Sequence, residues 1–312
     1  MELGQLLHQM VFDYTLRTIV LGCGLLGLAN GALGALALLR RQSLIGDSLS
    51  HAALPGVCVA FLLAGESKDP LVLLIGAGVS AWLGSLLASV ITQNTRIKDD
   101  AAQGIVLATF FGTGYVLLSL IQGRAGAGQA GLDKFLFGSA ASLVERDVQT
   151  IAALSALALG LMVLFYKEFK LLTFDPEFLA SMGFPRRRLD VLLTTLIVIV
   201  VVVGLQIVGV ILMVAMLIAP AAAARQWTNR LGAMIGISMA IGALSGISGA
   251  VASALQANTP TGPAVVIALT MAVMFSFIFG AERGLLWTWI QSRRSRRRAL
   301  ARGADRAYAA GD

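Results

Sequence analysis

The stretch LDVLLTTLIVIVVVVGLQIVGVILMVAMLIAPAAAA, residues 189–224, is apolar along nearly its whole length. As one helix its 36 residues would extend about 54 Å, at about 1.5 Å per residue. The hydrocarbon core of a bilayer is only about 30 Å thick. The stretch therefore predicts two membrane-spanning helices, 189–203 and 206–224, joined by a tight turn at Gly204-Leu205-Gln206. A single span here would reduce the predicted total from nine to eight.

The rest of the chain follows the same pattern. It has 312 residues, of which 57% are hydrophobic and 13% are charged, and its mean hydropathy is +0.81. A soluble domain carries about 25% charged residues. The apolar runs are continuous over about 20 residues and do not alternate, so they predict helices and not barrel strands. The expected fold class is an all-α polytopic membrane protein with nine spans: 18–39, 44–63, 70–91, 101–121, 148–166, 189–203, 206–224, 231–254 and 262–281.

The distribution of charge predicts the orientation of these spans. With the N-terminus outside and the C-terminus in the cytoplasm, 19 of the 24 lysines and arginines fall on the cytoplasmic side, as the positive-inside rule requires. Eight spans would place either Arg186–Arg188 or the basic tail outside. We interpret the net charge of +7 as topology and lipid contact, and expect no nucleic-acid partner. The chain divides into a transmembrane domain, 1–284, and a basic cytoplasmic tail, 285–312.

Small residues indicate how the spans pack. Glycines four residues apart let helix backbones approach closely, and three such pairs lie within the predicted spans: Gly27/Gly31, Gly232/Gly236 and Gly242/Gly246. Cys23 and Cys58 both fall within predicted spans, so we read them as small apolar residues and expect no disulfide. The first apolar run extends to Leu39, too long for a signal-peptide core, and we expect the first span to be retained.

Two connections are more than turns. Residues 122–147 begin with a glycine-rich stretch and become amphipathic, which predicts an interfacial or re-entrant helix. Residues 167–188 contain the signals of a short helix over 176–182, with an N-cap, a proline at its first position, an acid in its first turn and a glycine after its end. Its apolar face points to docking on another protein or, alternatively, to a place on the membrane surface. The residues concerned are Asp175, Pro176, Glu177, Phe178, Leu179, Met182 and Gly183.

The candidate site is the pair Asp47 and His51. Four residues apart, they share one face of the second span, and ionisable groups inside a membrane usually face a polar interior or a transport path. Pro55 displaces the carbonyl of His51 and so frees a polar group at that depth. A carboxylate with an imidazole suits Mn²⁺, Fe²⁺ or Zn²⁺. From the residues alone, a structural role is as well supported as metal binding. In that role Asp47 caps the helix and His51 forms a hydrogen bond with a neighbouring backbone group.

Other polar residues do not decide between a structural role and a role in transport or metal binding. Cys58 lies seven residues beyond His51 on nearly the same face, where packing is a simpler role than metal binding. Asn30, Gln103 and Gln206 suit either helix contacts or a path lining. The sequence has neither a phosphate-binding loop of the type GxxxxGK[ST] nor an HExxH motif. We therefore do not expect the chain itself to be an enzyme or an ATPase.

Four motifs carry a resemblance to a known family. They are GDSLSHAALPG (46–56), FLFGS (135–139), KEFKLLTFDPEF (167–178) and VGVILMVAMLIAPA (208–221). In this order, over roughly residues 15–283, they resemble the membrane permease subunit of bacterial ABC importers for manganese, zinc or iron, the ABC-3 family. The tail beyond Gly284 lies outside the resemblance.

The resemblance implies a transport subunit in the bacterial plasma membrane, with no permanently bound cofactor. It implies a second permease copy or a related permease, a cytoplasmic ABC ATPase that hydrolyses ATP, and an extracellular or periplasmic metal-binding protein. Asp47 and His51 match the family's metal site, and 176–183 matches the helix that couples to the ATPase. An ATP-independent cation or proton-coupled carrier, or a membrane scaffold, are the alternatives. The pair alone does not select among manganese, zinc and iron.

Overall fold

The computed structural model describes residues 14–65, 69–123, 143–255 and 260–282, together with 284, 285 and 287. Every regular element in these ranges is a helix, and eight helices are long and apolar enough to cross a membrane. They are α2 (Tyr14–Leu39), α3 (Ile45–Leu63), α4 (Pro70–Asn94), α5 (Asp99–Gln122), α7 (Glu145–Leu164), α10 (Arg186–Val208), α12 (Leu231–Leu255) and α13 (Thr261–Phe279). Three shorter helices join them: α8 (Tyr166–Phe174), α9 (Pro176–Ser181) and α11 (Val210–Ala224).

The long apolar run does form two helices, but the predicted turn at Gly204–Gln206 is wrong. Helix α10 continues through these residues, and the chain breaks at Gly209, where φ is 82° and ψ is 168°. A positive φ favours glycine, and Gly204 instead serves packing, since a Cβ there would lie 2.6 Å from the Met213 sulfur. Contact between residues 204 and 213 on either side of Gly209 shows that the chain reverses. Helix α11 has 15 residues, about 22 Å, and takes the place of the seventh predicted span, 206–224.

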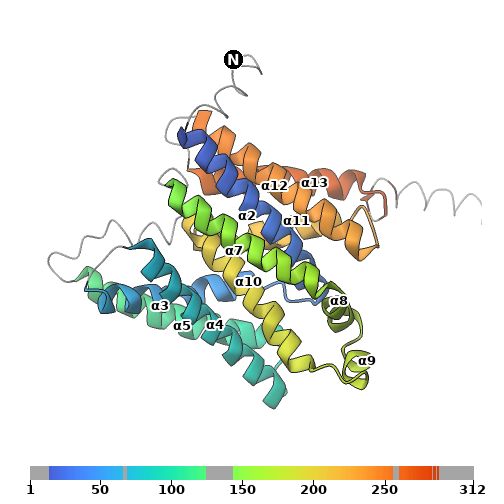
Figure 1. Cartoon of the computed structure of the whole chain (residues 1–312), viewed down its shortest axis with the longest axis horizontal. Helices are drawn as coiled ribbons and strands as arrows, with labels where there is room; N and C mark the ends of the chain where they lie inside the picture. The colour runs from blue at the N-terminus through green and yellow to red at the C-terminus, as the bar shows by residue number, and fades with distance from the viewer. Residues whose placement is uncertain are drawn as a thin grey trace, which may run out of the picture.

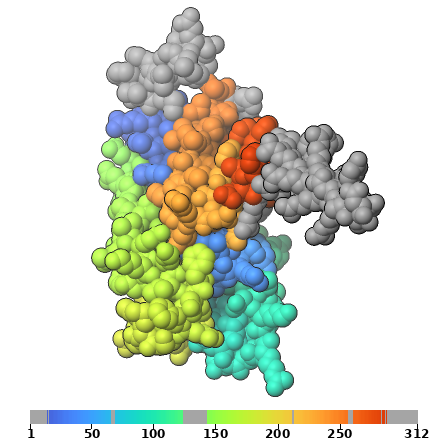
Figure 2. Space-filling view, turned by 90° about the vertical axis from the view of Figure 1, so that its right-hand side faces the viewer, coloured from blue at the N-terminus to red at the C-terminus, as the bar shows by residue number. Residues whose placement is uncertain are grey.

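The helices form two groups, which are connected through α10 and through the contact of α11 with α3 (Figure 1). Helix α2 packs mainly on α12, with α11 and α13 beside them and α7 along the other side, while α3, α4 and α5 pack on one another. Figure 2 shows the right-hand side of that view, with α12 in orange next to the blue start of the chain and the teal α4–α5 segment below. The candidate pair belongs to the smaller group.

Glycines allow a close crossing between α2 and α12. A Cβ on Gly27 would lie 2.2 Å from the carbonyl oxygen of Gly242, and one on Gly31 would lie 2.4 Å from that of Ser238. The register is antiparallel, and it continues to Gly246, which faces the backbone of Cys23. The pairs Gly27/Gly31 and Gly242/Gly246 thus allow close helix approach, as predicted. The pair Gly232/Gly236 does not, because a Cβ on Gly236 would meet no atom of the described chain within 4 Å.

The helix ends rich in arginine and lysine gather at one end of the bundle, called here the basic end. A polar cleft of about 570 Å³ brings together the end of α2, the end of α4 and the starts of α5 and α10. Its lining is Arg40, Gln42, Ser89, Thr92, Gln93, Asp99, Arg186, Arg187 and Asp190. The amphipathic part of 122–147 lies mostly outside the described residues, as does the basic tail apart from Leu285 and Trp287. A helix that the sequence did not predict, α8, precedes α9 at the basic end.

Candidate functional site

The start of α3 positions the candidate pair. Asp47 lies in the first turn of the helix and His51 follows one turn later. His51 Nε2 and Asp47 Oδ1 are 3.4 Å apart, longer than a good hydrogen bond. The two side chains remain 21% and 34% exposed respectively. The structure therefore brings the predicted pair together and leaves its donor atoms accessible to a further group.

The surroundings of α3 fix the direction in which the pair faces. The opposite side of the helix is packed: Gly46 lies close to Leu217 and Val214 of α11, and Leu49 is fully buried. On the other side, the imidazole of His51 meets the ring of Phe111 in α5, edge to face, with centroids 4.8 Å apart. His51 thus faces α5, and Asp47 lies one turn before it on the same face of α3.

Pro55 loosens α3 directly above the pair. It sits inside the helix and has no N–H to donate to the carbonyl of His51. The next carbonyl, that of Ala52, accepts a hydrogen bond of 2.7 Å from the Ser80 hydroxyl of α4. The turn that contains His51 is therefore held by α4 as well as by its own helix.

The pair has the chemistry of a partial metal site. Two ligand atoms 3.4 Å apart, each about 2.1 Å from one ion, subtend about 108° at that ion, close to the tetrahedral angle. Within the described residues, no group of three or more His, Cys, Asp or Glu side chains accompanies them. The Cys58 thiol is buried and points to the carbonyl of Gly114 in α5, so it does not join the pair. One chain offers two ligands, a weak and open site.

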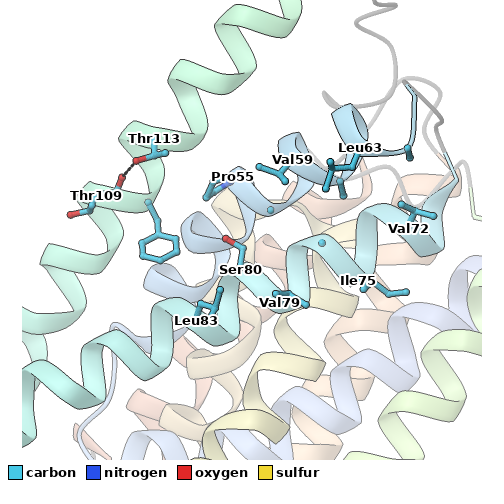
Figure 3. A pocket seen from close by; sticks show the side chains of 15 residues that line it. Pro55, Val59, Leu63, Val72, Ile75, Val79, Ser80, Leu83, Thr109 and Thr113 are labelled. Atoms are coloured by element: carbon cyan, nitrogen blue, oxygen red, sulfur yellow. Dashed lines mark hydrogen bonds between the residues drawn. The ribbon is translucent and has the colours of Figure 1, made fainter.

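The apolar groove of about 690 Å³ on α3, α4 and α5 is not an ion path (Figure 3). Most of its lining is aliphatic, from residues such as Val59, Ile75 and Leu83. The Thr109 and Thr113 hydroxyls already donate to carbonyls of their own helix, at 2.7 and 2.8 Å. The groove suits hydrocarbon and offers a cation no carboxylate, imidazole or thiol ligand.

The short helix α9 is capped as the sequence predicts. Asp175 Oδ1 accepts a hydrogen bond of 2.9 Å from the Phe178 N–H, and Pro176 occupies the first position. Gly183 follows with φ of 83°, the left-handed conformation expected after the helix. Phe178 in α9 is 51% exposed, and Met182, the residue directly after the helix, is 54% exposed.

Leu179 differs from the prediction that it shares the exposed face. It is fully buried and belongs to the hydrophobic core of the bundle. The reason is that α9 lies against α8 and the start of α10, and these cover the side on which Leu179 lies. Leu179 anchors α9 to the bundle, while Phe178 and Met182 face outward.

The structure also contains an ion pair that the sequence reading missed. Arg40, at the end of α2, binds the carboxylate of Asp190 in α10 through Nη2. The two residues are 150 positions apart, so no local spacing signals the contact. The one signal in the sequence is the position of Asp190. It is an acidic residue at the start of an apolar run, and that run follows three arginines.

Comparison with known proteins identifies the family. The ABC 3 transport family profile matches residues 12–280. The chain belongs to the ABC 3 transport family. It is 46% identical over 288 residues to the zinc transport system membrane protein TroC of Treponema pallidum, covering 92% of this chain and 96% of that protein. It is 48% identical over 280 residues to the manganese transport system membrane protein MntC of Bacillus subtilis, covering 90% of this chain and 64% of that protein.

A solved structure of a family relative has the same fold. PsaBC from Streptococcus pneumoniae in complex with Fab matches with a TM-score of 0.78 and 30% identity, over 90% of this chain and 98% of that chain. The ABC 3 membership and the apolar helices make this a multi-pass bacterial membrane protein. It is a transport subunit and not an enzyme, as the sequence predicted.

Proposed function

We propose that this ABC 3 protein is the permease of an ATP-driven importer for a divalent transition metal: manganese, zinc or iron. The observation that carries the proposal is the partly exposed Asp47/His51 pair inside a membrane helix, 3.4 Å apart and free of a third ligand in the described part of the chain. Charged groups at this depth are expensive and mark transport paths. The names of the two relatives, one for zinc and one for manganese, support a metal as cargo.

A second permease copy, or a related permease, completes the site. Helix α5 is the least covered wall of the pair, with only 22% of its span buried and contacts mainly to α3 and α4. Its outer face carries Gly104, Ala108 and Gly112, and a Cβ on either glycine would meet no described atom within 4 Å. Such a stripe allows close helix approach in a membrane. Two copies facing across this stripe supply four ligands, two carboxylates and two imidazoles.

The basic end faces the cytoplasm in this proposal, as the positive-inside rule requires. There α9 presents Phe178 and Met182 to a cytoplasmic ABC ATPase, whose ATP-driven motion alternates access to the pair. An extracellular or periplasmic metal-binding protein delivers the ion at the opposite end, near 64–69, 122–147 and 255–262. A helix lying on the membrane surface would not need caps at both ends and a buried anchor, so we favour docking.

Transport by purified components tests the proposal. The permease is reconstituted in liposomes with its ATPase and binding protein, and uptake of Mn²⁺, Zn²⁺ and Fe²⁺ is measured with and without ATP. We expect uptake of one or more of these ions only when the ATPase, ATP and binding protein are all present. Equal uptake by the permease alone would instead support an ATP-independent carrier.

A further inference from the structure

The connection between α2 and α3 is rigid. At the end of α2, the Gln42 N–H donates to the Ala37 carbonyl and the Arg41 N–H to the Leu38 carbonyl, both at 3.0 Å. These are the two hydrogen bonds of a Schellman motif, with Arg41 in the left-handed position at φ of 60°. The Ile45 N–H then bonds the Gln42 carbonyl at 3.3 Å, and α3 begins. A displacement of residue 40 therefore reaches the start of α3 without being absorbed in a flexible linker.

The connection between α9 and α10 is built in the same way. The Gly183 N–H donates to the Ala180 carbonyl at 3.0 Å, and the Phe184 N–H donates to the Leu179 carbonyl at 3.3 Å. The Leu189 N–H bonds the Pro185 carbonyl at 3.2 Å, within the first turn of α10. With Leu179 also buried in the bundle, α9 and the start of α10 form one mechanical unit.

The Arg40–Asp190 ion pair is the side-chain link between these two rigid connections. Its side chains are only 15% and 20% exposed, so the pair is shielded from much of the solvent. Arg40 lies seven residues before Asp47, and Asp190 lies in the first turns of α10, eleven residues after Leu179. Arg40 Nη1 and the Gln42 amide oxygen are also buried without a partner in the described part of the chain. The guanidinium of Arg40 therefore binds Asp190 through Nη2, while its Nη1 makes no hydrogen bond within the described residues.

We propose that Arg40 and Asp190 are positioning residues that transmit the movement of α9 to Asp47 and His51. The inference rests on the proposed function, in which an ATPase displaces α9. Displacing α9 carries the start of α10 with it, and Asp190 draws Arg40 and the rigid connection to α3. The pair thus ties the geometry of the ion ligands to the state of the ATPase. Neither residue contacts the ion.

The number of ions transported per ATP hydrolysed measures this link in the reconstituted transporter. The variants are Arg40→Gln, Asp190→Asn and the exchange Arg40→Asp with Asp190→Arg. The control is Arg188→Gln, an exposed arginine of the same helix start with no ion pair in the described residues. We expect each single variant to bind the ATPase normally and to lower the ratio at least about tenfold, the exchange to restore most of it, and the control to leave it unchanged.

Three outcomes would overturn the inference. The first is an unchanged ratio in Arg40→Gln. The second is lower abundance and thermal stability in the single variants without a change of ratio, as expected of a purely structural pair. The third is an exchange variant that assembles with the ATPase but keeps a low number of ions transported per ATP hydrolysed. This third outcome tests the inference even if the single variants fold poorly. Uptake that survives Asp47→Ala would reject the proposed function itself, so the two failures are distinguishable.

Discussion

Replacement of Phe178 tests the docking role of α9 with a magnitude taken from the structure. A phenylalanine buries about 200 Å² when fully covered, and 51% of Phe178 is exposed, so docking can cover about 100 Å² more. At about 25 cal/mol per Å², that burial contributes about 2.5 kcal/mol. Phe178→Ala loses most of it, so the Kd for the ATPase should rise roughly thirtyfold. Phe178→Glu should weaken binding further, because a carboxylate would be buried in an apolar groove.

Titration of the ATPase onto the permease in nanodiscs measures this affinity. The matched control is Leu157→Ala in α7, a residue of the same exposed fraction, 51%, on a membrane-spanning helix. It should leave the Kd unchanged. A Phe178→Glu permease that still captures the ATPase with wild-type affinity would refute the assignment of α9 as the docking helix.

Three further predictions concern the helices that support the site. Gly27→Ala should lower the thermal unfolding midpoint, since its Cβ would lie 2.2 Å from a backbone oxygen of α12, whereas Gly236→Ala in open space should not; equal midpoints would contradict the crossing. Asp175→Ala removes the N-cap bond of α9, costing about 1 kcal/mol, and should weaken ATPase binding several-fold in the same titration; an unchanged Kd would mean that the cap is dispensable. Gly104→Leu should convert permease dimers to monomers in native mass spectra, and Gly78→Leu in α4, equally open, should not; persistent dimers would place the second copy elsewhere.

The features decided by local sequence could be predicted. Apolar runs of about 20 residues identify the long helices, because each run must satisfy its own backbone inside the membrane. The caps of α9 follow from Asp175, Pro176 and Gly183, whose preferences act within a few residues. Asp47 and His51 come together because four residues are one helical turn. Each of these depends only on short spacings.

The errors arose where packing decides. Gly204 and Gly209 are both glycines in an apolar run, and only the contact of Gly204 with Met213 shows which one is free to adopt a positive φ. Leu179 was assigned to an exposed face, but the side of a six-residue helix that is covered depends on its neighbours. The Arg40–Asp190 pair joins residues 150 positions apart, a distance over which a single sequence carries no pairing signal.

Cellular metal content is the most direct test of the role of Asp47 and His51 at the start of α3. Wild type, Asp47→Ala and His51→Ala are expressed with the cognate ATPase and binding protein, and manganese, zinc and iron are quantified. Asp100→Ala, which removes an exposed carboxylate at the start of α5, is the control. At equal membrane abundance, the account predicts that both site variants lose accumulation of the same metal while the control keeps it. Undiminished accumulation in both site variants would show that Asp47 and His51 are structural and contradict the central claim.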